Sequence, residues 1–130
     1  MISQANTLLR TCVNSIGQPI AWPREGAPEV TALLVEMAPG EETGWHRHPV
    51  PLLGYILTGE LTVYQATGEK RVVRPGEVSL ESVNVVHNGV NEGAVPLKMI
   101  SILPAGTVSI LKPWLSSHAL TTAMSESATP

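Results

Sequence analysis

Several residue types that mark common protein classes are scarce in this chain of 130 residues. Cys12 is the only cysteine, so no disulfide can form within the chain and we expect a cytoplasmic protein in which Cys12 is a small buried hydrophobe. The eight lysines and arginines are scattered and the formal net charge is −3, so no basic stripe predicts a nucleic-acid partner. The apolar runs are far shorter than a membrane span, and the start lacks the features of a signal peptide, so we expect no membrane partner.

Phenylalanine is absent, so leucine, valine and isoleucine must fill the interior. Hydrophobic residues make up 43% of the chain and charged residues 15%, which is typical of a folded globule rather than a disordered segment. The length favours one domain over residues 1–130.

The middle of the chain predicts an all-β fold. Apolar and β-branched segments alternate with turns such as Pro-Gly and Thr-Gly, and no 3.6-residue periodicity occurs between residues 29 and 111. Short strands at this spacing are typical of a sandwich or barrel, whose core we place at about residues 29–111. The expected strands are residues 31–38, 52–57, 60–64, 70–74, 77–81 and 95–103.

The two ends of the chain differ from its middle. Residues 7–22 could add flanking strands, over residues 7–13 and 19–22. In the tail of residues 113–130, Pro113 is acceptable at the first position of a helix, which could run to residue 124, and the polar end is expected to fray.

The segment of residues 52–57 is apolar on both faces, interrupted only by Gly54. A strand buried on one face should alternate apolar and polar residues, so this strand is expected to be covered on both faces. We therefore predict a homodimer, with Leu53, Tyr55 and Leu57 facing outward near the contact.

Histidines carry the strongest chemical signal. His46 and His48 are spaced i, i+2, which places both side chains on one side of an extended segment, about 6–7 Å apart. Trp45 and Arg47 have the opposite parity and are expected to point outward. With His87 from a later strand, three neutral imidazoles could converge on one ion, and such a site suits zinc, iron, nickel or copper.

These residues resemble the two motifs of the cupin superfamily. Ser82 and Asn84 stand where the second motif has a proline and a glycine, and asparagine tolerates left-handed geometry better than most residues. The resemblance implies a jelly-roll barrel, the double-stranded β-helix, with turns at the motif glycines and a structural role for the motif asparagine. The residues at motif spacing are Gly40, His46, His48 and Gly59, followed by Gly76, His87 and Asn91.

The important departure is Leu52, which stands where the family has a metal-binding glutamate. The resemblance then implies a metal site of His46, His48 and His87 without a protein carboxylate. Such a site leaves a charge of about +2 on the ion instead of about +1, which raises its Lewis acidity. The sequence does not decide whether another residue replaces the glutamate. The candidates near in sequence are Glu36, Glu41, Glu42 and Glu81, with Tyr64 and Gln65 as alternatives if they face inward.

The resemblance implies a small metalloprotein that holds iron, zinc, nickel or manganese and acts on a small organic acid or phenolic compound. With iron the chemistry would be that of a dioxygenase, and with the other ions that of an isomerase or hydrolase. Leu52, Ile56 and Met99 are expected to wall the substrate pocket, and no general base is identifiable. The alternative is a non-catalytic module that binds or senses a small ligand. His118 lies outside both motifs and is expected to be a surface residue.

Overall fold

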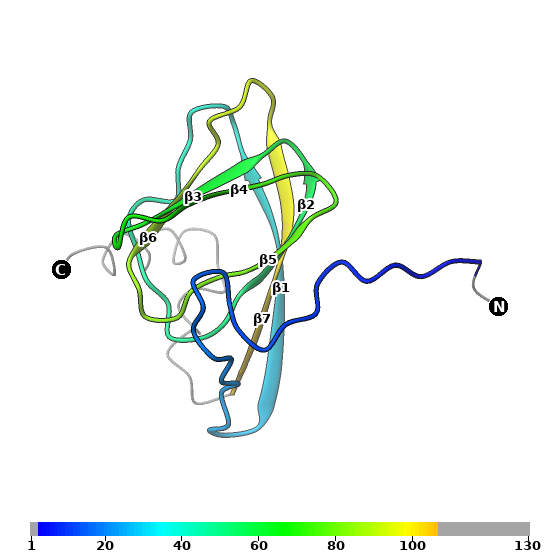
Figure 1. Cartoon of the computed structure of the whole chain (residues 1–130), viewed down its shortest axis with the longest axis vertical. Helices are drawn as coiled ribbons and strands as arrows, with labels where there is room; N and C mark the ends of the chain where they lie inside the picture. The colour runs from blue at the N-terminus through cyan, green and yellow to red at the C-terminus, as the bar shows by residue number, and fades with distance from the viewer. Residues whose placement is uncertain (1–2, 107–130) are drawn as a thin grey trace.

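Residues 3–106 are described by a computed structural model and form two antiparallel sheets (Figure 1). One sheet has the strand order β1-β7-β2-β5, and the other has the order β4-β3-β6. The strands are β1 (Pro28–Met37), β2 (Leu53–Thr58), β3 (Leu61–Gln65), β4 (Lys70–Val73), β5 (Val78–Leu80), β6 (His87–Val90) and β7 (Leu97–Gly106).

The two sheets enclose the core. Alternate side chains of each strand point between the sheets, as the buried and half-exposed positions of β1 show. Figure 1 shows the long strands β1 and β7 side by side, with β3, β4 and β6 grouped on one side of them. The all-β prediction is confirmed. The main apolar cluster consists of Met37, Ile56, Leu61, Val63, Val73, Leu97 and Met99.

The six strands expected from the sequence are all present, with ends that differ by a few residues. Strand β6 carries His87, which was expected on a later strand, but its bounds were not among the expected strands because the sequence His87-Asn-Gly-Val90 has no apolar alternation. Residues 7–13 and 19–22 contribute only an isolated bridge between Val13 and Pro19. The expected helix at residues 113–124, the fraying end and His118 lie outside the described residues.

The expectation that Cys12 is buried is wrong, because its side chain is exposed. Figure 1 shows the N-terminal segment, in blue, running outward from the sheets, so it has no second layer to bury it. Within residues 3–106, no helix has the length and apolar character needed to cross a membrane.

Turn geometry follows the motif positions. Gly40, Gly59 and Gly76 have φ angles of 87°, 77° and 83°, and Asn84 is the only non-glycine residue of the described part with a positive φ, at 59°. Asparagine thus replaces the motif glycine in a backbone conformation that few other residues tolerate.

The segment between β1 and β2 lies against β6. Isolated bridges pair Glu42 with Val90 and His46 with His87, and the amide of Thr43 donates to the carbonyl of Gly89. Residues 42–46 therefore form an irregular edge of the β4-β3-β6 sheet, next to β6. This pairing brings the histidines of the first motif close to His87 of the second motif.

Candidate metal centre

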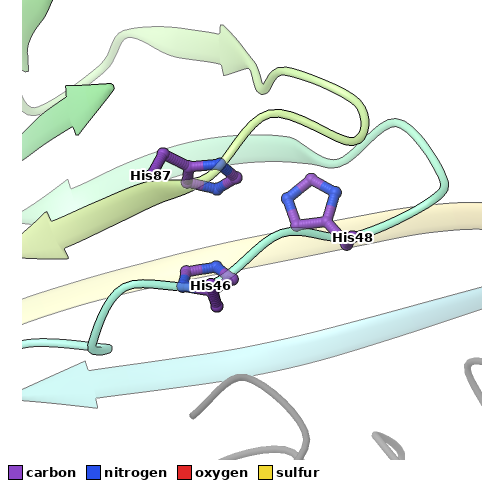
Figure 2. Close-up of side chains that lie close together, drawn as sticks. All are labelled: His46, His48 and His87. Carbon is purple, nitrogen blue, oxygen red and sulfur yellow. The ribbon is translucent and has the colours of Figure 1, made fainter. Parts of the chain in front are cut away.

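Three buried imidazole rings, of His46, His48 and His87, lie close together (Figure 2). His46 and His48 come from the segment after β1, and His87 begins β6. Each ring offers one nitrogen within 4.8 Å of the other two, and ring centroids are 4.5 Å apart for His46 and His87 and 4.9 Å apart for His48 and His87. The residues are at most 2% exposed. Three nitrogen donors this close can contact a single ion.

Backbone hydrogen bonds fix the separation between the two motifs. The amide of His46 donates to the carbonyl of His87 at 2.9 Å, and the amide of His87 donates back at 2.7 Å. This reciprocal pair belongs to an antiparallel bridge, which holds the two Cα atoms at a set distance. Trp45 and Arg47, with the opposite parity, are exposed as expected.

Every ring of the cluster uses its Nδ1 atom on a backbone carbonyl two residues away. Nδ1 of His46 lies 2.7 Å from the Gly44 oxygen, Nδ1 of His48 lies 2.7 Å from the Val50 oxygen, and Nδ1 of His87 lies 2.8 Å from the Val85 oxygen. A carbonyl only accepts, so each Nδ1 carries the proton and a neutral ring has its lone pair on Nε2. Metal-binding histidines use this arrangement to fix ring orientation.

Two polar side chains support the rings further. The hydroxyl of Ser82 donates to Oε1 of Gln65 at 3.1 Å and lies 3.2 Å from Nδ1 of His87. Ser82 has no exposed surface. The serine that stands at the proline position of the second motif therefore makes a buried contact with His87. On the other side, the Thr43 hydroxyl lies 3.3 Å from Nδ1 of His46.

Glu81 is the carboxylate nearest to the histidine cluster. Its Oε1 atom lies 3.3 Å from Nε2 of His48 and 3.1 Å from Nε2 of His87, and its side chain is 12% exposed. A neutral Nε2 that keeps its lone pair cannot donate to a carboxylate. These contacts are therefore favourable only when protons or a cation lie between the three atoms.

Burial and the neighbouring charges shift the pKa values in opposite directions. Burial, together with repulsion from His87, lowers the pKa of His46 from 6.5 to about 4, so this ring is neutral at pH 7. Burial alone would lower the pKa of His87, but the contact with Glu81 outweighs it and the net shift is upward. Burial would raise the pKa of Glu81, yet hydrogen bonds to His48 and His87 hold it far below 4.5, so Glu81 is ionised. A lone pair on His46 and an ionised Glu81 suit a cation.

A cavity of about 200 Å³ opens beside the cluster, with His46, His87 and Glu81 in its wall. Leu52 and Met99 line it, together with further apolar residues from β1 and β3. Ile56 packs in the core cluster instead and is not among the residues that line this cavity. The volume is below the roughly 300–1,000 Å³ of pockets that take drug-sized ligands, so the cavity suits a small molecule.

The other three glutamates named as candidates also line the cavity, but their side chains are exposed. Glu36 is exposed and pairs with Lys98 at 3.7 Å. Glu41 and Glu42 line the cavity but are exposed. The Tyr64 hydroxyl donates to Glu92 on the surface.

The sequence could have singled out Glu81 by strand pairing. Leu53 pairs with Leu80 in the antiparallel register of β2 and β5, and the amide of Glu81 donates to the carbonyl of Leu52 at 2.9 Å. Glu81 therefore stands next to the position where the family has its glutamate. The signal was the pairing register of β2 with β5, which are not consecutive in the sequence, so composition and spacing alone do not give it.

Comparison with known protein families identifies one match. The sequence model described as cupin domain matches residues 33–103, more than half of the chain and all of the segment that builds the site. The cupin-domain-containing oxidoreductase fogC of Aspergillus ruber (strain CBS 135680) is 31% identical over 75 residues. That alignment covers 55% of this chain and 36% of the relative, so the chain spans little more than a third of the length of that protein.

Solved structures share the architecture. A protein with a double-stranded β-helix domain from Klebsiella pneumoniae superposes with a TM-score of 0.54 at 22% identity, over 67% of this chain and 84% of that chain. Oxalate oxidase superposes with a TM-score of 0.51 at 28% identity, over 57% of this chain and 41% of that chain.

Proposed function

Because this chain belongs to the cupin family, we propose that it is a small metalloprotein that binds a divalent ion through His46, His48 and His87. Three Nε2 atoms, with their protons held on Nδ1 by backbone carbonyls, carry the proposal. Three imidazoles favour iron, zinc or nickel over calcium or magnesium. The buried cluster fits such an ion, because without a cation or added protons on the rings it leaves nitrogen lone pairs facing an ionised carboxylate.

We further propose that the protein acts on a small organic acid or phenolic compound, with chemistry of the dioxygenase or isomerase type. The ion would supply Lewis acidity for a bound oxygen ligand, or redox chemistry if it is iron. Apolar walls from Leu52 and Met99 would exclude water from that ligand. The oxidoreductase assignment of fogC and the similarity to oxalate oxidase support this direction.

Metal analysis of protein purified without added metal tests the first proposal. We expect about one equivalent of a transition metal, and a melting temperature that falls on chelation and returns on re-addition, because an ion that binds only the native state stabilises it. His87→Gln should lose the metal, while Arg47→Gln, on the same segment as His46 and His48 but exposed, should keep it.

A wild-type protein that contains no metal and melts at one temperature with or without iron, zinc, nickel and manganese would overturn the proposal. That result would favour the alternative, a non-catalytic module that binds a small ligand in the apolar cavity. If metal is bound, oxygen uptake on a panel of small organic acids and phenols separates dioxygenase chemistry from the other chemistries.

We also propose that the protein is a homodimer formed through the outer face of the β1-β7-β2-β5 sheet. In one row across the four strands, Leu34, Ile100, Tyr55 and Val78 lie opposite one another. Val30, Leu34, Tyr55 and Leu57 are exposed large hydrophobic residues. We call this surface, comprising Val30, Leu34, Leu53, Tyr55, Leu57 and Ile100, the outer apolar face; the exposed ion pair of Glu36 and Lys98 follows it on the same side of β1 and β7. An apolar surface of this kind is typical of contacts between identical chains.

A further inference from the structure

The antiparallel register of β2 and β5 places Glu81 directly beside Leu52, where the family has its glutamate. Leu53 pairs with Leu80, and the amide of Glu81 donates to the Leu52 carbonyl at 2.9 Å, so residues 52 and 81 continue the same ladder. Directly opposite residues of antiparallel strands point to one face of the sheet, with Cβ atoms about 4.5–5.5 Å apart. Both residues line the cavity beside the histidines. A carboxylate at residue 81 can therefore reach the region that a glutamate at residue 52 would occupy.

The distances from Glu81 to the histidines match those between two ligands of one ion. For nitrogen and oxygen ligands at about 2.1 Å from an ion, neighbouring ligand atoms lie roughly 3.0–3.4 Å apart in octahedral or tetrahedral geometry. Oε1 of Glu81 is 3.3 Å from Nε2 of His48 and 3.1 Å from Nε2 of His87. The carboxylate is thus already at ligand spacing from two of the three rings.

The Glu81 carboxylate has little contact with water. Its side chain is 12% exposed, so the carboxylate has given up most of its water. Removing an anion from water is costly unless a charge partner compensates, and the described part of the chain brings no lysine or arginine within 4.0 Å of it. The compensating charge must come from protons on the rings or from a bound cation.

From these observations we infer that Glu81 is the fourth protein ligand of the metal, and that it replaces the family glutamate lost at Leu52 from the neighbouring strand. The inference rests on the proposed metal site. It changes the expected charge on the ion from about +2 to about +1, the value of a site with one carboxylate. The site would then be less acidic than the three-histidine site that the sequence implied.

Exchanging the two residues tests the inference. Metal affinity is measured by competition with a chelating dye, using manganese(II) and cobalt(II), and the cobalt(II) absorption spectrum reports the ligand set independently of catalysis. Glu81→Gln should weaken binding about 100-fold or more and change the cobalt spectrum, while Glu42→Gln, an exposed cavity residue, should do neither. The double variant Leu52→Glu with Glu81→Leu should recover both the affinity and the spectrum.

The outcomes separate this inference from the proposed function. If wild-type protein binds no cobalt, the metal site itself is refuted. If wild type binds cobalt and His87→Gln does not, but Glu81→Gln binds with unchanged affinity and spectrum, only the role of Glu81 is refuted. The double variant gives an answer even if Glu81→Gln fails to fold: a folded double variant that binds as weakly as a histidine variant would also refute it.

Discussion

Each imidazole of the cluster is oriented by the backbone of its own segment. The accepting carbonyls belong to Gly44, Val50 and Val85, each two residues from the histidine that donates to it. A ring fixed in this way loses little further freedom when an ion binds. The three donor nitrogens are therefore oriented in advance for the proposed ion.

Asn91 serves the fold rather than the chemistry. Its Nδ2 donates to the carbonyls of Met37 and Val95 at 3.0 and 2.9 Å, and its Oδ1 accepts from the amide of Gly93 at 3.0 Å. The side chain has no exposed surface and lies outside the cavity lining. The motif asparagine thus joins the end of β1 to the start of β7.

Asn91→Asp should lower the free energy of unfolding by about 2–4 kcal/mol, because a buried carboxylate cannot donate to two carbonyls. Urea unfolding followed by circular dichroism measures the loss. Asn84→Asp is the matched control, since it makes the same chemical change at an exposed position and should alter stability by less than about 0.5 kcal/mol. Equal stability of Asn91→Asp and wild type would contradict the structural role.

For single residues, the sequence predicts correctly which way a side chain points wherever side chains alternate along an extended backbone. The parity of His46 and His48 against Trp45 and Arg47 follows from an extended backbone alone. The position of Glu81 depends on which residue of the next strand lies opposite, and that is set by pairing. For the same reason Ile56 was expected in the wall of the substrate pocket, whereas the structure packs it in the core cluster.

Among the elements, the turn between β2 and β3 is the most constrained. Gly59 has a φ of 77°, and a Cβ built there would lie 2.7 Å from the Pro96 oxygen and 2.8 Å from the Leu97 Cα. Both contacts are to backbone, which cannot move aside without shifting the start of β7. The close approach of this turn to the start of β7 therefore requires glycine at residue 59.

Gly59→Ala should cost about 3 kcal/mol or more, from the left-handed backbone and the collision together. Gly17→Ala is the control, because Gly17 has a similar φ of 86° with nothing within 4 Å of the added atom, so only about 1 kcal/mol should be lost. Thermal unfolding of the two variants compares them directly. Equal losses would mean that the approach to β7 does not limit the turn.

The sequence predicts strands well where apolar residues alternate over many positions. It predicts them poorly in short segments without such alternation. Strands β1 and β7 have ten residues each and were expected over most of their length. Strand β6 has only four residues, and it is defined by its pairing with β3, where its partners are Gln65, Tyr64, Val63 and Thr62. The segments before β1 have apolar residues but no neighbouring strand to pair with, apart from one bridge.

On the scale of the whole molecule, the outer apolar face gives the clearest prediction. The wild-type protein should have twice the mass of its 13.8 kDa chain at micromolar concentration. Leu34→Lys with Tyr55→Lys should give single chains, because two like charges in an apolar contact cannot be solvated. Light scattering coupled to gel filtration measures both masses.

Val95→Lys is the control, since Val95 is 55% exposed but precedes β7 and lies off the sheet. It should leave the mass unchanged. A wild-type protein that is monomeric at micromolar concentration contradicts the homodimer.

The reciprocal hydrogen bonds between His46 and His87 make the two motif segments one mechanical unit. His46 and His87, two of the proposed ligands, are thus also hydrogen-bonded partners in one antiparallel bridge. Local opening of the irregular edge at residues 42–46 would therefore release the ion, and an ion held in place would keep that edge closed. The rate of metal release and the rate at which residues 42–46 separate from β6 would then be set by the same local opening.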